Sequence, residues 1–299
     1  MKCLAVVVAL IALAGPGGPA LRTIGPKGPA LRDRVTALVA KSGADVAVVF
    51  RTLDARDELL VNPDLEFHAA STMKVPVMIE LFRQARAGTL ALDDRVPVVN
   101  EVHSIVDGSP FRLDAGDDSD ADVYTHVGGT MSYRELCDQM ITVSSNFAAN
   151  ILIERLGATS IQKTSDDLGA DGMHVRRGVE DSKAFAKGLN NTTTARALAT
   201  LMAAIAEGRA VDADASRDMV EILARQHFND RIPAGVPRGV RVAHKTGDIT
   251  RIQHDAAIVF ARRPYVLVIL IRGLDDAKKG SALAAQISRA VFESVRQGG

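Results

Sequence analysis

The segment E-F-H-A-A-S-T-M-K-V-P-V-M-I-E-L-F, residues 66–82, joins a short strand-like stretch to an apolar run that is typical of a helix. Ser71 and Lys74 stand three positions apart at the junction. A helix that begins at Ser71 places both side chains on one face, and its N-terminus offers unpaired N–H groups to an anion. The two residues outline an activated nucleophile, with a plain helix N-cap as the alternative role for Ser71.

The spacing S-x-x-K carries little information by itself, because a second copy occurs at Ser160 to Lys163. That copy lies in a stretch with the periodicity of an ordinary surface helix. The assignment of Ser71 therefore depends on the motifs that accompany it further along the chain.

The length and charge of the chain exclude some classes of partner. Its 299 residues are enough for one large domain or two medium ones with a substantial core. Lysine plus arginine and aspartate plus glutamate each number 36, so there is no basic excess. Nucleic-acid and anionic-membrane binding both favour such an excess, so we expect neither partner.

The first 20 residues have the pattern of a secretory signal peptide. A charged start at 1–2 precedes an apolar run at 3–14 and a Gly/Pro-rich exit at 15–20. The run is short for a bilayer span, and no cysteine follows it as a site for lipid attachment. We expect a periplasmic or secreted protein without a stable membrane anchor; a buried core helix is the alternative.

Removal of this signal peptide would take Cys3 with it and leave Cys137 as the single cysteine, so no internal disulfide is expected. Cys137 lies on the apolar side of a predicted helix, which favours a small buried residue over a thiol nucleophile. No cluster of His, Cys and Asp has metal-ligand spacing. We expect no metal and no cofactor.

Patterning predicts strands near both ends of the chain and helices in the middle. Strands are expected at 45–52, 58–62, 240–245, 255–262 and 265–272, and helices at 31–41, 133–143, 147–156, 160–168, 192–206, 213–226 and 276–295. This order indicates an α+β fold, an α/β sandwich with a five-stranded antiparallel sheet flanked by helices. We expect one domain over 21–299, with an all-helical subdomain inserted at about 87–238.

Two long segments lack regular patterning. Residues 91–131 carry clusters of Asp, Gly and Ser, and residues 169–191 are rich in charge and glycine. An irregular segment of that length inside a compact domain is usually a working loop or a lid.

Three short motifs follow one another in the chain: S-T-M-K at 71–74, S-S-N at 144–146 between two helices, and K-T-G at 245–247 on a strand. Each motif is weak alone, but together they resemble the superfamily of class A β-lactamases and penicillin-binding proteins. The similarity extends over F-H-A-A-S-T-M-K-V-P at 67–76, R-E-L-C at 134–137, S-S-N-F-A-A-N at 144–150, N-T-T-T-A-R at 191–196 and H-K-T-G at 244–247. It implies this fold and a small-molecule β-lactam substrate. The sequence does not fix the oligomeric state, for which a monomer is our default expectation.

The resemblance implies a role for each residue of the first two motifs. Ser71 would attack the substrate carbonyl, with Lys74 as its proton acceptor or as the charge that lowers its pKa. Ser144 would pass a proton to the leaving nitrogen. Asn146 would bind the substrate amide and orient Lys74. A polar turn between helices is the alternative role for 144–146.

The third motif would bind the substrate. The resemblance implies that Lys245 supplies positive charge to an anionic substrate and Thr246 a hydroxyl, with Gly247 next to them on the strand. The N–H groups of Ser71 and Asp248 would form the oxyanion hole. An exposed strand without a ligand is the alternative.

Departures from the family pattern bear on turnover. Ser145 stands where these lactamases commonly have aspartate. Glu180 matches the family's deacylating glutamate, but Ala184 replaces the asparagine that would help to hold the hydrolytic water. We expect Glu180 to be the general base for deacylation. A surface carboxylate paired with Arg177 or Lys183 is the alternative.

Many relatives bind the substrate carboxylate through an arginine on the strand after K-T-G. His254 occupies that place here, and Arg251 is near enough in sequence to substitute. If His254 has this role, the affinity for anionic substrates falls above its pKa. A strand histidine held by a neighbouring group is the alternative.

The leading hypothesis is an exported serine β-lactamase of the class A type that hydrolyses the β-lactam amide through a Ser71 acyl-enzyme and confers antibiotic resistance. The altered segment after Glu180 keeps a slow penicillin-binding hydrolase or a D-Ala-D-Ala peptidase or amidase open. A noncatalytic cell-wall binding protein with the same fold is the third hypothesis.

Overall fold

A five-stranded antiparallel sheet forms one half of the protein, of which the computed structural model describes residues 28–297. The strands lie in the order β2-β1-β11-β10-β9. Their bounds are β1 (Asp45–Thr52), β2 (Glu58–Val61), β9 (Arg241–Ile249), β10 (Ile252–Phe260) and β11 (Tyr265–Arg272). The first two and the last three strands of the predicted sheet therefore meet, and the predicted fold class is confirmed.

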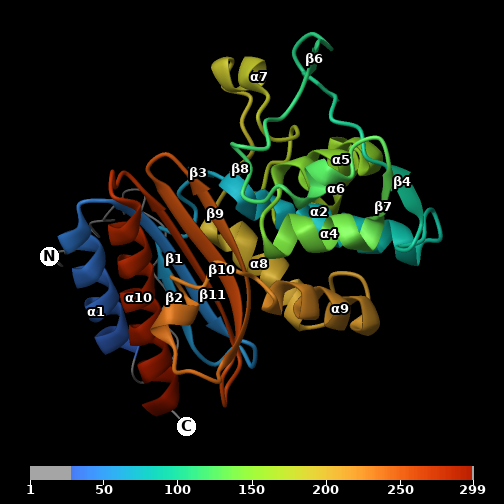
Figure 1. The fold of residues 1–299 in the computed structure, drawn as a ribbon. Helices are drawn as coiled ribbons and strands as arrows, with labels where there is room; N and C mark the ends of the chain where they lie inside the picture. Colours follow the sequence, from blue (N-terminus) through green and yellow to red (C-terminus); the bar gives the residue numbers. More distant parts are fainter. Residues whose placement is uncertain (1–27, 298–299) are drawn as a thin grey trace, which may run out of the picture.

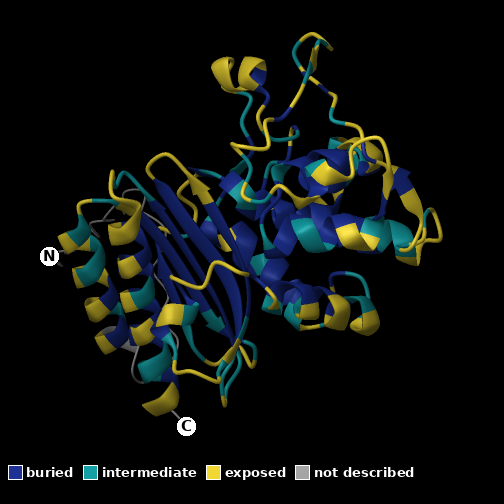
Figure 2. Ribbon diagram, in the orientation of Figure 1, coloured by how far each residue is buried: buried dark blue, intermediate teal, exposed yellow. Residues whose placement is uncertain are grey.

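Apolar residues on both faces of the central strands explain why the sheet is covered on each side. Val46, Val48 and Phe50 of β1 pack with the terminal helices α1 (Gly28–Ser42) and α10 (Ala277–Gln297). Ala47 and Val49 of the same strand belong to the core of the helical half. Figure 1 shows α1 and α10 together on one face, and Figure 2 shows the strands buried between the two layers.

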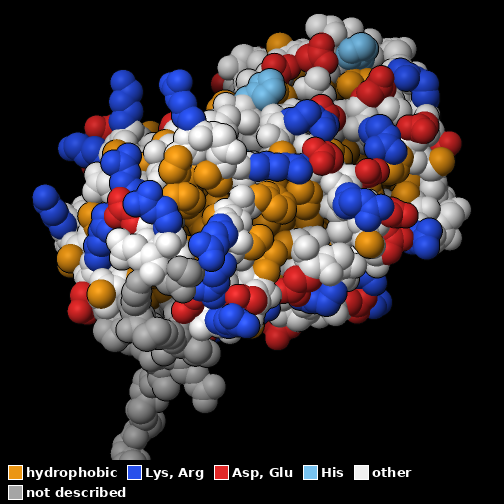
Figure 3. All heavy atoms as spheres, turned by 90° about the horizontal axis from the view of Figure 1, so that it is seen from below, with side chains coloured by type: hydrophobic (Ala, Val, Ile, Leu, Met, Phe, Trp, Pro, Cys, Tyr) orange, Lys and Arg blue, Asp and Glu red, His pale blue; other side chains and the backbone are white. Residues whose placement is uncertain are grey.

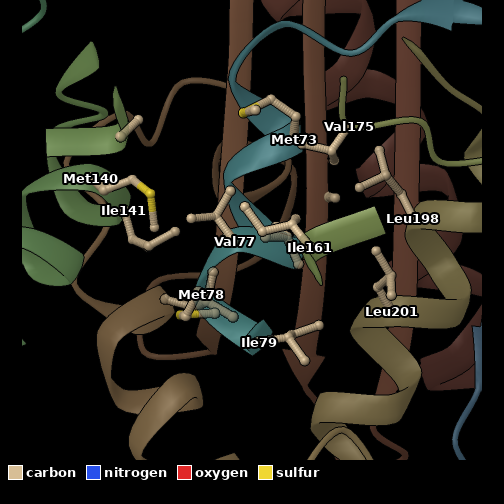
Figure 4. Close-up of a cluster of buried hydrophobic side chains, with 14 of the residues drawn as sticks. Met73, Val77, Met78, Ile79, Met140, Ile141, Ile161, Val175, Leu198 and Leu201 are labelled. Carbon is tan, nitrogen blue, oxygen red and sulfur yellow. The ribbon is translucent and has the colours of Figure 1, made fainter. Parts of the chain in front are cut away.

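The helical half surrounds α2 (Lys74–Arg86), whose first nine residues are all buried. Its neighbours are α4 (Tyr133–Thr142), α5 (Asn146–Leu156), α6 (Ala158–Asp167) and α9 (Ala213–Ala224). Helix α8 (Ala195–Ala206) packs on β1, β10 and β11 and on α9. Figure 4 shows Val77 and Ile79 of α2 among side chains such as Ile141, Ile161 and Leu201. These helices lie in the region predicted as an insertion, and the limits of that subdomain stay a prediction.

The sequence S-Y-R-E at 132–135 has the S-x-x-E spacing that predicts a capping box, and the start of α4 has this box. The Glu135 N–H donates to the Ser132 hydroxyl (3.2 Å), and the Ser132 N–H donates to the Glu135 carboxylate (2.6 Å). Cys137 of α4 is fully buried and free, as expected for a small core residue. Burial raises the pKa of its thiol to about 12.

The irregular segment 91–131 folds into short pieces. They are β4 (Arg95–Pro97) paired with β7 (Thr130–Ser132), β5 (Val102–His103) paired with β6 (Pro110–Phe111), and α3 (Asp122–Thr125). The β5–β6 hairpin is tied to the second loop, because the Asp181 carboxylate accepts from the Ser104 hydroxyl (2.9 Å) and the Ile105 N–H (3.0 Å). Asp181 also caps the short helix α7 (Ser182–Ala186), so the two loops form one assembly.

Charges of both signs alternate over the face seen in Figure 3, around a patch of hydrophobic side chains. This distribution agrees with the balanced composition and gives no single basic field on that face. Within residues 28–297, no helix is both long and apolar enough to cross a membrane. The predicted signal peptide, residues 1–20, lies outside the described residues.

Candidate active site

Ser71 lies on a 3-10 turn, η1 (Ala70–Met73), which leads directly into α2. The turn follows β3 (Phe67–His68), which pairs with β8 (Thr192–Thr193). Ala70 has a φ of 46°, a left-handed conformation that a residue with a side chain adopts only under constraint. The sequence predicts one helix that begins at Ser71, whereas the structure has a tighter 3-10 turn before α2 begins at Lys74. Pro76 therefore falls within the first turn of α2, where a missing N–H costs little.

The K-T-G strand β9 runs along the edge of the sheet beside this turn. Gly247 makes the approach possible: a Cβ there would lie 3.2 Å from the Ser71 nitrogen and 3.0 Å from Cγ2 of Thr72. Distances of this kind are tighter than ordinary carbon contacts, so any larger residue would push the strand away from the nucleophile. The late lysine motif and the early serine motif are thereby brought together.

A cavity of about 660 Å³ opens above Ser71, between the sheet and the helical half. It is lined by residues of both loops and of all three motifs: His68, Ala70, Ser71, Asp117, Ser119, Ser144, Asn146, Arg177, Val179, Glu180, Asn191, His227, Phe228, Asn229, Asp230, Arg231, Thr246, Asp248 and Ile249. Its size suits a small organic ligand, and polar groups converge on one end of it.

Lys74 is fully buried and held by three hydrogen bonds. Its Nζ donates to the Ser144 carbonyl oxygen (2.6 Å), the Ser144 hydroxyl (3.3 Å) and Oδ1 of Asn146 (2.8 Å). Burial lowers the pKa of this amine to about 7, while the negative charges of Asp118 and Glu180 oppose the shift. A lysine with such a pKa can accept a proton near neutral pH.

A second buried lysine meets the first at Ser144. Lys245 Nζ donates to the Ser144 hydroxyl (2.9 Å) and to the Thr246 carbonyl (2.9 Å). Burial lowers the pKa of Lys245 well below its ordinary value, and the charge of Lys74 adds to the effect. The Ser144 hydroxyl therefore stands between two amines, at a residue whose φ is 63°. This chain of groups can carry a proton across the cavity.

Asn146 connects Lys74 to the loop carboxylate. Its Nδ2 donates to Oε1 of Glu180 (2.7 Å), while its Oδ1 accepts from Lys74. Partial removal from water raises the pKa of Glu180, the hydrogen bond from Asn146 lowers it, and the nearby Asp118 charge raises it. The result is a carboxylate at the cavity rim that is more basic than an ordinary glutamate. Neither Arg177 nor Lys183 pairs with it: Lys183 binds Asp107.

Thr246 and Asp248 both line the cavity, whereas His254 does not. His254 is fully buried, its Nε2 donates to the His68 carbonyl (3.0 Å), and its Nδ1 accepts from the Ile271 N–H (3.2 Å). Burial lowers the pKa of His254 to about 3, so it stays neutral at ordinary pH. The prediction that His254 binds a substrate carboxylate is corrected: it is a core histidine.

The cation that the sequence analysis missed is Arg231. Its side chain is 6% exposed and lines the cavity, where it donates to the His254 carbonyl (2.7 Å) and pairs with the Asp248 carboxylate. Arg251, which the sequence analysis offered in place of His254, lies in the turn after β9 and pairs with Asp275 (3.0 Å). No motif marked Arg231, because it comes from the segment after α9 and enters the site only through the tertiary fold.

The second S-x-x-K copy, at 160–163, is unrelated to this cavity. Lys163 lies on α6 with its side chain 73% exposed and pairs with Asp167 one turn later (2.7 Å). The contrast with the buried Lys74 shows why the spacing alone does not identify a nucleophile.

A hydroxyl on a constrained turn, two buried amines, an amide and a raised-pKa carboxylate provide the groups that acyl transfer needs. The fold and this site together define the class A serine β-lactamase-like superfamily. A family model described as the beta-lactamase enzyme family matches residues 30–295. The chain belongs to that family.

Relatives of known sequence agree with this assignment. A beta-lactamase of Bacillus amyloliquefaciens is 30% identical over 178 residues, which cover 57% of this chain and 58% of that protein. Beta-lactamase AST-1 of Nocardia asteroides is 32% identical over 179 residues, 57% of each chain. These matches span less than two thirds of either relative.

Solved structures match over more of the chain. A structure of PBP-A is 28% identical with a TM-score of 0.77, covering 93% of this chain and 100% of that one. A beta-lactamase from Sphaerobacter thermophilus is 25% identical with a TM-score of 0.76, covering 89% and 98%. A mutant of PBP-A was solved as an acyl-enzyme complex with penicillin G.

Proposed function

We propose that this protein is a serine β-lactamase that hydrolyses the β-lactam amide through an acyl-enzyme at Ser71. The observation that carries the proposal is the continuous set of hydrogen bonds from Lys245 through Ser144 and Lys74 to Asn146 and Glu180, at one end of a cavity lined by Ser71. Such a set has a proton acceptor for each of the two steps that hydrolysis requires.

In the acylation step, the Ser71 oxygen forms a bond to the lactam carbonyl carbon and its proton passes to neutral Lys74. The C–N bond of the ring then breaks, and the leaving nitrogen takes a proton through the Ser144 hydroxyl. In this proposal the N–H groups of Ser71 and Asp248 receive the oxyanion, a contribution of roughly 3 kcal/mol per donor. Arg231, which lines the cavity, supplies positive charge for an anionic substrate, and Lys245 adds to it in its protonated form.

In the deacylation step, Glu180 removes a proton from a water, whose oxygen attacks the ester carbon. The ester C–O bond breaks, and the Ser71 oxygen recovers the proton that Glu180 took from the water, so that both groups return to their starting states. The raised pKa of Glu180 makes it a better base than an ordinary glutamate. Asn146 holds Oε1 of Glu180, whereas Ala184 is a buried residue without a polar side chain to hold the water.

One assay tests the proposal: the purified protein is mixed with a chromogenic cephalosporin, and colour and intact mass are followed together. Continuous hydrolysis at catalytic enzyme concentration is the expected result. A protein that gives neither colour nor a mass adduct would rule it out and favour a noncatalytic binding protein.

The second candidate is a penicillin-binding hydrolase that acylates but turns over slowly. It is favoured by Ala184, which leaves Glu180 with one amide neighbour, and by the similarity to PBP-A over nearly the whole chain. A stoichiometric adduct on the wild-type protein without steady colour development would select this candidate.

The proposal includes export. The charged start, short apolar run and Gly/Pro exit of residues 1–20 support it. Expression of the full chain in a bacterium, followed by fractionation and mass measurement, should give a periplasmic or secreted protein that begins near residue 21. Retention of the full-length chain in the cytoplasm would refute export and leave the hydrolase proposal intact.

A further inference from the structure

Residues 113–131, the second part of the irregular segment 91–131, are here called the 113–131 loop. Asp118 of this loop binds the start of α5, the helix that carries Asn146. Its carboxylate accepts from the Asn146 N–H (2.8 Å), the Phe147 N–H (2.9 Å) and the Ser145 hydroxyl (3.2 Å). These are charge-assisted bonds at the positive end of the α5 dipole. The main chain of Asn146 is therefore fixed by a residue 28 positions earlier in the sequence.

A tyrosine of the same loop holds Asp118 in turn. The Tyr124 hydroxyl donates to Oδ2 of Asp118 (3.1 Å), and its ring packs on Phe147 with centroids 4.7 Å apart. Burial and the Asp118 charge raise the pKa of this phenol, so it stays a donor. The loop is thus held against the start of α5 by the Asp118 hydrogen bonds and by the contact between the Tyr124 and Phe147 rings.

The Asn146 side chain makes two hydrogen bonds whose lengths depend on where these contacts hold α5. Its Oδ1 lies 2.8 Å from Lys74 Nζ, and its Nδ2 lies 2.7 Å from Oε1 of Glu180. A movement of about 1 Å in α5 would lengthen both bonds, and misplacements of that size can cost about 100-fold in rate. Position 145, meanwhile, is a serine that supplies no charge of its own.

We infer that Asp118 is a positioning residue that sets Asn146 between Lys74 and Glu180, and that it provides from the 113–131 loop the carboxylate that S-S-N lacks at Ser145. This inference rests on the proposed hydrolase function. It makes the loop part of the reacting assembly rather than a passive cover.

The test compares Asp118→Ala with an exchange variant, Asp118→Ser combined with Ser145→Asp, in the full chain. An aspartate at an N-cap accepts from the N–H groups of the first helical turn, so the exchange returns a carboxylate to the same helix end. Asp120→Asn is the matched control, because within residues 28–297 the Asp120 carboxylate accepts a hydrogen bond only from the Asp122 N–H in the same loop (2.7 Å).

The turnover number for a chromogenic cephalosporin is measured well below each variant's melting temperature, or the acylation rate if the wild type only acylates. Asp118→Ala should lose about 100-fold, the exchange should recover at least tenfold, and the control should stay within twofold. If the wild type is active and the turnover number of Asp118→Ala lies within threefold of it, the inference is wrong but the hydrolase proposal stands. The same conclusion follows if the exchange variant is folded but as slow as Asp118→Ala. An inert wild type overturns the hydrolase proposal and the inference with it.

Discussion

In the proposed mechanism, Glu180 is the base that releases the acyl-enzyme. Replacement by glutamine keeps the shape and the contact with Asn146 but removes the base, so deacylation should slow by about 10²- to 10⁴-fold while acylation continues. Stopped-flow measurement with a chromogenic cephalosporin should give a burst of one equivalent followed by a slow phase. Unchanged steady turnover in Glu180→Gln would show that another group activates the water.

In the proposed mechanism, the pKa of Lys74 sets the pH dependence of acylation. An ammonium cannot accept the Ser71 proton, so the active form is the neutral amine, and the acylation rate should rise with pH through about 7 and level off above it. The charged groups facing the amine are Asp118 and Glu180, which raise its pKa, and Lys245. Single-turnover acylation from pH 5 to 9 tests this; a rate that falls across the range contradicts it.

The N-cap of α4 is an element whose contribution can be isolated, because Ser132 lines no part of the cavity. Ser132→Ala should lower the free energy of unfolding by about 1 kcal/mol, whereas Ser132→Gly, the matched control, should lose only a few tenths. Urea denaturation measures both. Equal stabilities for the alanine variant and the wild type would contradict the role of the capping box.

At the scale of single elements, sequence patterns predicted the structure correctly where the environment of a side chain follows from local periodicity. The strand 45–52 and the capping box at Ser132 were predicted as found, because alternation and capping are set by neighbours in the sequence. His254, Arg231 and Asp118 depend on residues brought together from distant segments. Their surroundings follow from the tertiary fold, so no local pattern could place them.

At the scale of the molecule, the sheet separates two cores and the site lies at the edge of one of them. Cys137 reports on the helical core. In a Cys3→Ser variant its thiol should resist a disulfide reagent at pH 8, because burial blocks access and a pKa of about 12 leaves about one thiolate in 10⁴. Labelling within minutes under native conditions would contradict a closed core.

The fold joins its ends around the site: early and late strands form the sheet, and the K-T-G strand at its edge meets the turn that carries Ser71. Two loops from the helical half line part of the cavity, with Asp117, Ser119 and Glu180 among the lining residues. Asp118 and Asp181 hold these loops in place through hydrogen bonds to the main chain of Asn146 and Ile105. The proposed reaction therefore depends on contacts across the whole molecule, although the proposed nucleophile comes from a four-residue motif.

The most direct measurement is the location of the acyl group after brief exposure of Glu180→Gln to benzylpenicillin. Intact mass should increase by one whole penicillin molecule, because ring opening expels no atoms, and peptide mapping should place the adduct on Ser71. The adduct should be lost in the double variant that combines Ser71→Ala with Glu180→Gln. It should be kept in the control that combines Ser160→Ala, from the second S-x-x-K copy, with Glu180→Gln. An adduct on any other residue, or one that survives Ser71→Ala, would contradict the account.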